Sequence, residues 1–202
     1  EGAGFLVLEA LDSAIERGAP IHGELCGDGV GAEAHHITNP LESGAGAAHV
    51  LRLALRSARI EPRDVGYVNA HGTATPLNDA MEALAIRDVF GPAAKDVPVS
   101  SSKSQLGHTL GAAGAVEAVI ATLALEHGVL PATVGLEHPD PVCDLLHVRE
   151  PGGIFAARFA LSSSFGFGGN NTVLAFGSPA VARAPREVAP LDHRRVAVTG
   201  IG

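Results

Sequence analysis

Apolar side chains recur along this chain with two different periods, and each change of period marks a predicted element. Short apolar runs bounded by glycine or polar residues predict strands at 4–9, 21–36, 65–70, 97–102, 155–164 and 171–178. Helical spacing, in most cases closed by glycine, predicts helices at 11–18, 45–60, 79–91 and 111–128. Strand and helix segments therefore alternate along most of the chain.

The segment 45–60 shows the helical pattern most clearly, and Ser43 before it is the expected N-cap. Its apolar residues fall on one stripe, which comprises Ala47, Val50, Leu51, Ala54, Leu55 and Ala58. The last two predicted strands are joined instead by FGFGGN, a glycine-rich loop typical of an antiparallel pair. The whole pattern predicts an α/β fold with a mixed sheet, parallel where helices intervene and antiparallel at the end.

Both ends are expected to lie within a longer protein. The N-terminal stretch EGAGFLVLE is neither a signal peptide nor an ordinary translation start. Residues 178–195 carry three prolines and no apolar periodicity, which predicts a linker. Residues 196–202, VAVTGIG, then have the pattern of a new buried strand, and we expect them to open a second domain.

Composition narrows the function classes. The chain has 202 residues, of which 46% are hydrophobic and 18% charged, sufficient for one ordinary domain with a sizeable core. A formal net charge of −8 without any Lys/Arg cluster disfavours nucleic acid and anionic membranes as partners. Two distant cysteines, Cys26 and Cys143, indicate neither a disulfide framework nor a thiolate metal site, and they fit a reducing cytoplasm. No apolar run approaches the roughly 20 residues of a membrane span.

Three loops carry the candidate chemistry. NAHGTATPLND (69–79) and SSSKSQLGHTLGAAGA (100–115) each join a predicted strand to a helix, and SSSFGFGGNN (162–171) joins two strands. His71 and His108 lie on the first two loops, and such loops gather at one edge of a mostly parallel sheet. Phosphate binding is disfavoured because neither glycine-rich loop has GxxxxGK[ST], or GxGxxG opening a helix.

Structural interpretations stay open for each candidate when position alone is considered. Lys103 and Glu117 could be an ion pair that braces a helix, Thr73 and Thr75 could cap local amides, and Asp79 could be a helix N-cap. The remaining histidines are interpreted as structural: His22, His35, His36, His49, His127, His138, His147 and His193.

The histidines suggest a zinc hydrolase as an alternative function, but their spacing along the sequence disfavours a zinc site. The chain has no HExxH motif. His35 and His36 are adjacent on a predicted strand, so their side chains point to opposite faces and cannot close on one ion.

Taken together and in this order, the three loops resemble the C-terminal half of a β-ketoacyl-acyl-carrier-protein synthase, a condensing enzyme of the thiolase-like fold. The resemblance runs from EGAGFLVLE through ELCGDGVGAEAHHITNP to NTVLAFGS, over roughly residues 1–177. It implies an α/β thiolase-like half with a mixed five-stranded sheet between helices. RRVAVTGIG at the end is similar to the first strand of the same family, which implies that a second such domain follows the linker.

The resemblance implies decarboxylative Claisen condensation of malonyl-carrier-protein with an acyl thioester, in fatty-acid or polyketide synthesis. His71 and His108 occupy the family's two histidine positions, where neutral imidazoles donate to the malonyl thioester oxygen. Lys103 matches the lysine that orients the second histidine, and Glu117 matches its charge partner.

The same resemblance implies substrate contacts. Phe167 matches the residue whose amide contributes to the oxyanion hole and whose ring gates the acyl pocket, and Phe165 and Gly168 belong to the same substrate-binding loop. Thr73 and Thr75 match the hydroxyls that bind the pantetheine arm.

The expected partners follow from the family. They are the acyl carrier protein, which brings its own phosphopantetheine, the N-terminal half that carries the nucleophilic cysteine, and a second ketosynthase in a homodimer or heterodimer. No metal or organic cofactor of the chain itself is expected. Cys26 within a strand and Cys143 in an irregular segment do not match the nucleophile, so we expect that cysteine outside this chain.

Two positions depart from the family pattern. Ala74 stands where serine or glycine is common, and Asn170 stands where threonine is common; we expect both to tune pocket polarity. A non-catalytic chain-length or carrier-docking partner of the same fold is the alternative function. Retention of His71, Lys103 and His108 favours the enzyme.

Overall fold

The computed structural model describes residues 1–150, 152, 155–184 and 196–201. Within them one sheet has eight strands in the order β1-β8-β2-β7-β6-β3-β4-β5. The strands are Leu6–Ala10 (β1), Gly23–Ala32 (β2), Val65–Asn69 (β3), Pro98–Ser100 (β4), Leu146–His147 (β5), Phe159–Gly166 (β6), Asn170–Gly177 (β7) and Val196–Ile201 (β8). β3 pairs in parallel with β4 and β6, whereas β7 is antiparallel to both β6 and β2.

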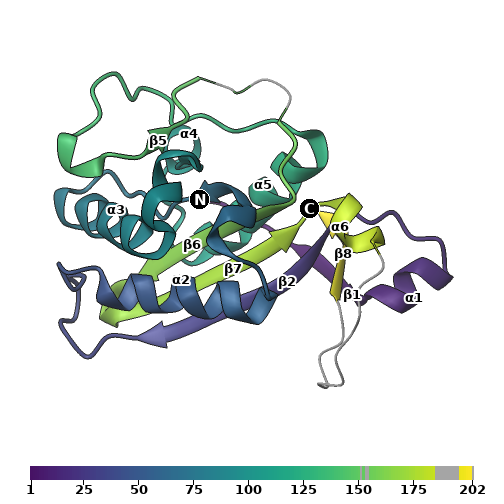
Figure 1. The fold of residues 1–202 in the computed structure, drawn as a ribbon. Helices are drawn as coiled ribbons and strands as arrows, with labels where there is room; N and C mark the ends of the chain where they lie inside the picture. Colours follow the sequence, from purple (N-terminus) through teal and green to yellow (C-terminus); the bar gives the residue numbers. More distant parts are fainter. Residues whose placement is uncertain (151, 153–154, 185–195, 202) are drawn as a thin grey trace.

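Helices cover both faces of this sheet (Figure 1). They are Leu11–Glu16 (α1), Ala45–Ala58 (α2), Pro76–Phe90 (α3), Lys103–Leu106 (α4), Ala113–His127 (α5) and Pro179–Arg183 (α6). The largest apolar core lies where α2 and α3 pack on one face, and a second core lies beneath α5 on the other. The predicted stripe of α2 accounts for much of the first core, because all six of its residues are buried.

The α/β class and the mixed sheet are confirmed, but the predicted number of five strands is wrong. The five central strands, β2, β7, β6, β3 and β4, are extended at both edges. β5 has only two residues, too few for an alternating pattern to reveal it. At the other edge β8 pairs with β1 and β2, a contact between the two ends of the described chain that local periodicity cannot predict.

Two predicted helix caps are wrong. α3 begins at Pro76 with Thr75 as its N-cap, so Asp79 lies in the first turn. Proline suits the first helical position because its φ is already helical and it has no N–H to satisfy. α2 begins after Gly44, whose φ is 69°, and Ser43 precedes that cap by one residue.

The C-terminal segment differs in part from the predicted linker. α6 lies inside residues 178–195, because Pro179 and the residues after it form a short helix with Val181 and Ala182 buried. Residues 185–195 lie outside the described residues. Residues 196–201 form β8, and their role as the first strand of a second domain stays a prediction.

The stretch Leu110–His127, which contains α5, is apolar on all sides. Its 18 residues have a mean hydropathy of 1.3, so by length and composition alone it could span a membrane. It instead packs against β6 and β7 and includes the buried carboxylate of Glu117. The packing is that of a core helix.

The register of β3 and β4 brings the two histidine loops together. Val68 pairs with Val99 and Asn69 with Ser100, so the parallel strands end side by side. A hydrogen bond of 2.8 Å from the N–H of Ala70 to the carbonyl of Ser100 joins the starts of the loops. The loops that carry His71 and His108 therefore leave the same edge of the sheet.

Candidate active site

His71 and Gly72 directly follow β3, and three side chains bind all four of their backbone polar groups. Both carboxylate oxygens of Glu82, on α3, accept hydrogen bonds of 2.9 Å, one from each N–H. Lys103 Nζ donates to the carbonyl of His71 at 2.6 Å, and Ser101 Oγ donates to the carbonyl of Gly72 at 2.8 Å. Because buried backbone groups need partners, these side chains hold the dipeptide in place without regular secondary structure.

The rings of His71 and His108 lie edge to face, with centroids 5.5 Å apart and planes at 85°. The Phe165 ring packs against His71 on another side, at 5.8 Å. His71 is buried and His108 is exposed. The N–H of Leu110 donates to Nδ1 of His108 at 3.2 Å, so a neutral His108 ring carries its proton on Nε2.

The surroundings keep both rings neutral. Burial, with further contributions from Lys103 and His108, lowers the pKa of His71 to about 3. Burial and the Lys103 charge also lower the pKa of His108. Uncharged imidazoles at neutral pH can donate N–H hydrogen bonds without bringing a positive charge of their own.

Lys103 and Glu117 form a buried ion pair beneath the loop that carries His71, the first histidine loop. Burial raises the pKa of Glu117, and the hydrogen bond from Lys103 opposes that shift. The lysine was expected to orient the second histidine, but its two hydrogen bonds go to the carbonyl of His71 and to Glu117. Its influence on His108 is therefore electrostatic.

The turn between β6 and β7 carries Phe167 and Gly168. The Phe167 side chain is 76% exposed, and Gly168 has a φ of 78°, which suits glycine. The N–H of Gly168 donates to the carbonyl of Ile37 at 2.8 Å. Asn170 Nδ2 donates back to the carbonyl of Phe167 at 3.3 Å, so this departure from the family pattern braces the turn.

Glu33 ties the same turn to the loop after β2. Its N–H donates to the carbonyl of Gly169 at 2.9 Å, and its carboxylate accepts from Asn171 Nδ2 at 2.7 Å and from the N–H of Leu41 at 3.0 Å. The loop 33–44 and the glycine turn are therefore held as one unit.

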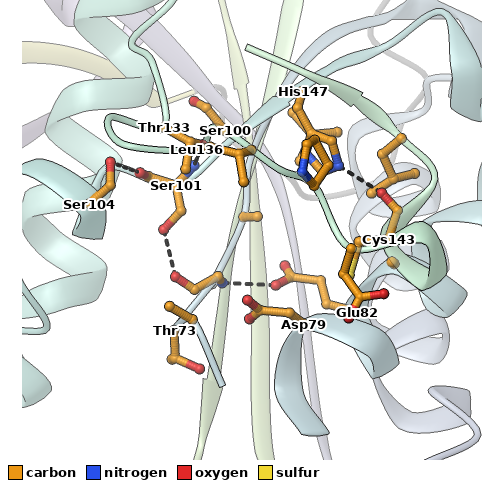
Figure 2. Close-up of a pocket in the computed structure, with 18 of the residues that line it drawn as sticks. Thr73, Asp79, Glu82, Ser100, Ser101, Ser104, Thr133, Leu136, Cys143 and His147 are labelled. Atoms are coloured by element: carbon orange, nitrogen blue, oxygen red, sulfur yellow. Dashed lines mark hydrogen bonds between the residues drawn. The ribbon is translucent and has the colours of Figure 1, made fainter. Parts of the chain in front are cut away.

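A cavity of about 630 Å³ opens beside the histidine loops, between α3, the loop after β4 and residues 133–147. Figure 2 shows Thr73, Asp79 and Glu82 on one side of it and Ser101, Ser104 and Thr133 on another. Thr75 and His108 also line it, and the hydroxyls of Thr73 and Thr75 lie 2.9 Å apart. The two hydroxyls hydrogen-bond to each other, and because each hydroxyl has one donor and two acceptor sites, the pair keeps unused capacity at the wall of a space large enough for a ligand.

The sequence that forms these loops has a direct counterpart among known proteins. Residues 22–137, more than half of the chain, match the family described as "Beta-ketoacyl synthase, C-terminal domain". The chain belongs to that family.

Individual relatives agree with the assignment. The chain is 46% identical over 176 residues to 3-oxoacyl-[acyl-carrier-protein] synthase 2 of Synechocystis sp., covering 87% of this chain and 42% of the relative. Among solved structures it is similar to the ishigamide ketosynthase/chain length factor (TM-score 0.79, 40% identity, 83% of this chain and 41% of that one). It is also similar to a chain in a complex of a type II polyketide synthase acyl-carrier protein with its ketosynthase (TM-score 0.80, 36% identity, 83% and 41%). The β-ketoacyl synthase domain therefore spans less than half the length of these relatives. The similarity to solved ketosynthases confirms the predicted thiolase-like fold.

Both cysteines of this synthase domain lie outside the loops that carry His71 and His108. Cys26 lies within β2, and Cys143 lies in a short 3₁₀ turn at the cavity wall. Burial, followed by the charges of Asp79 and Asp140, raises the pKa of the Cys143 thiol, which disfavours the reactive thiolate.

Three of the histidines interpreted as structural, His22, His36 and His147, have hydrogen-bond partners among the described residues. His22 Nδ1 contacts Glu126 at 3.0 Å, His36 accepts from the backbone of its own turn, and His147 Nε2 lies 2.7 Å from the carbonyl of Cys143. His193 lies outside the described residues. Among the described residues, no group of three or more His, Cys, Asp or Glu side chains could hold a metal ion.

Sequence patterns did not indicate Glu82, Ser101 or Glu33 as site residues. Glu82, Lys103 and Ser101 together form a cradle around the backbone of His71 and Gly72. Glu82 is buried, and burial raises its pKa to about 7 against the opposing hydrogen bonds from Gly72 and His71. A carboxylate on the buried side of a predicted helix is a signal that could have identified it. Ser101 and Glu33 lack such a signal, because serine is common in loops and Glu33 stood within a predicted strand.

Proposed function

We propose that this domain supplies the decarboxylation and oxyanion-binding part of a β-ketoacyl synthase, an acyltransferase that extends acyl chains by Claisen condensation. The observation that carries the proposal is the pair of neutral imidazoles, His71 and His108, whose rings meet 5.5 Å apart at the sheet edge. Two such N–H donors suit an oxygen that gains negative charge during a reaction.

The proposed chemistry has two stages, of which the first breaks a carbon–carbon bond and the second forms one. The bond between the malonyl Cα and its carboxylate breaks, carbon dioxide leaves, and the electron pair forms a thioester enolate whose oxygen accepts from the two imidazoles. The enolate carbon then attacks an acyl thioester on a cysteine outside this chain, a carbon–carbon bond forms, and the cysteine leaves as thiolate. The amide of Phe167, in the glycine turn, is proposed to stabilise the oxyanion of that second stage.

Supporting groups have proposed roles of their own. Lys103, paired with Glu117, holds the first histidine loop and favours neutral imidazoles. Thr73 and Thr75 receive the pantetheine arm at the cavity wall. Phe165, whose ring packs against His71, and Gly168 in the turn after it are proposed to shape the acyl side.

The proposed partners are an acyl carrier protein, the N-terminal half with its cysteine, and a second ketosynthase or chain-length subunit. Solved relatives whose titles name an acyl-carrier protein or a chain length factor support the first and third. We further propose a cytoplasmic enzyme without a metal or organic cofactor of its own. Nucleic acid and membranes are not proposed as partners.

The test uses the complete synthase and malonyl-carrier-protein, with release of carbon dioxide as the measurement. His71→Ala and His108→Ala should each slow release by about 10²–10³-fold, the usual effect of removing one oxyanion donor. Unchanged release in both variants would overturn the proposal.

A non-catalytic chain-length or docking partner is the second candidate, because the titles of three solved relatives name a chain length factor. It predicts that the complete, unsubstituted protein binds malonyl-carrier-protein without releasing carbon dioxide. Retention of both histidines and of Lys103 favours the enzyme.

A further inference from the structure

We propose that Ser101 is a positioning residue that fixes the catalytic geometry of His71 by holding the carbonyl of Gly72. The inference rests on the proposed function, because it assigns a role within that reaction. It concerns a residue outside the family's histidine and lysine positions. Ser101 touches no reacting atom and acts through the backbone of the first histidine loop.

The His71 ring needs such help. Its Nδ1 is buried and has no hydrogen-bond partner among the residues that the structure describes. A functional histidine is usually oriented by a hydrogen bond at its second ring nitrogen. Here the direction of the ring depends on packing against His108 and Phe165 and on the position of its own backbone.

Ser101 holds that backbone at close range. Its hydroxyl donates to the carbonyl of Gly72 at 2.8 Å. Gly72 has a φ of 42°, and a Cβ added there would lie 2.6 Å from Cβ of Ser101. The Ser101 side chain thus packs directly against Gly72, in space that any other residue at position 72 would fill, and its hydroxyl lies beside the Gly72 carbonyl.

Ser101 is itself fixed from both sides. Its N–H donates to Oγ1 of Thr133 at 3.0 Å, and its carbonyl accepts from Oγ of Ser104 at 2.9 Å. Figure 2 shows the resulting chain of hydrogen bonds, which runs from Ser104 through Ser101 to the loop held by Glu82. The backbone of Ser101 is anchored in this way, so its hydroxyl can hold the position of the Gly72 carbonyl.

The location explains why this contact matters for catalysis. Ser101 lies on the loop after β4 that also carries Lys103 and His108, whereas Gly72 lies on the loop of His71. Of the side chains in the cradle, Lys103 and Glu82 can carry charge and so also affect protonation, but the serine is neutral. Its loss should therefore change geometry alone and move one imidazole relative to the other.

The test compares Ser101→Ala with Ser163→Ala in the complete synthase. Ser163 is a matched control, since its hydroxyl is also buried, lies on β6 and has no hydrogen-bond partner among the described residues. We expect Ser101→Ala to lower kcat for carbon dioxide release about tenfold with KM for malonyl-carrier-protein nearly unchanged, within the 10²-fold that a displacement of 1 Å costs. Ser163→Ala should change neither constant.

A second readout is independent of activity. The imidazole carbon-bound proton resonances of His71, assigned through a His71→Gln variant, should shift in Ser101→Ala and stay unchanged in Ser163→Ala. If Ser101→Ala does not fold, Ser101→Cys, which keeps a weaker donor, should show intermediate changes in both readouts.

The outcomes separate the two proposals. Ser101→Ala or Ser101→Cys with unchanged kcat and unchanged His71 resonances would overturn the positioning role. If His71→Ala and His108→Ala both leave carbon dioxide release unchanged, the proposed function fails. If Ser101→Ala still shifts the His71 resonances in that case, Ser101 holds His71 without serving that reaction, which overturns the catalytic part of this inference.

Discussion

The ammonium group of Lys103 donates to the backbone carbonyl of His71 at 2.6 Å and also forms an ion pair with Glu117. A buried cation is thereby fixed against the loop that carries His71 and is close enough to lower the pKa of both histidines. Lys103 thus combines two effects, since it fixes the loop of His71 and favours neutral imidazoles.

His71 should remain neutral across the physiological range. Burial, assisted by Lys103 and His108, lowers its pKa to about 3, far below the ordinary value of 6.5. Its ring resonances, followed by NMR between pH 5 and 8, should therefore show no titration. A midpoint near 6.5 for the resonance that disappears in His71→Gln would contradict the described burial.

Glu82 should make stability depend on pH in the opposite sense to an ordinary surface carboxylate. Its pKa is raised from 4.5 to about 7, so the folded protein retains a proton that the unfolded chain has already released. The stability that this group contributes is fully present below pH 4.5 and is lost as the pH rises through 7.

We expect the difference in melting temperature between the wild type and Glu82→Gln to fall as the pH rises from 5 to 7. Since Glu82→Gln leaves His71 in place, the contribution of that histidine cancels in the comparison. A constant difference over this range would show that Glu82 does not take up a proton on folding.

Removing one member of the buried ion pair should be costly, and removing both should be less so. Lys103→Met leaves Glu117 buried without its partner, and breaking such a pair typically costs about 3–5 kcal/mol. The double variant Lys103→Met/Glu117→Gln should recover part of that loss, as measured by urea denaturation. Lys95→Met is the control, because its ion pair with Asp144 is exposed and should contribute less than about 1 kcal/mol.

Glycine should stabilise the protein at two positions with left-handed backbone. Arg59, at the C-terminus of α2, has a φ of 54°, and Ala74, in the first histidine loop, has a φ of 58°. This conformation costs a residue with a side chain about 1–2 kcal/mol. Arg59→Gly and Ala74→Gly should each raise the free energy of unfolding by roughly that amount.

Arg56→Gly serves as the matched control for this comparison. Arg56 lies in the regular last turn of α2, where glycine should lower the free energy of unfolding by about 1 kcal/mol. Equal effects of glycine at positions 56 and 59 would argue against the left-handed conformation of Arg59.

Local sequence patterns alone determined the α/β class, the alternation of elements and the positions of the three loops. Strand and helix periods are properties of consecutive residues, so β3, α3, β4 and α5 appear near their predicted places. The proximity of His71 and His108 followed as well, because loops after neighbouring parallel strands leave the same edge of a sheet.

Only the tertiary structure decided which side chains hold those histidines. The cradle of Glu82, Lys103 and Ser101, and the link from Glu33 to the glycine turn, are hydrogen bonds between residues distant in sequence. The edge pairing of β8 with β1 is of the same kind. Periodicity indicates which face of an element is buried. It does not indicate which side chain on another element binds a backbone carbonyl or N–H that has no partner in regular secondary structure, because that pairing depends on how the elements pack.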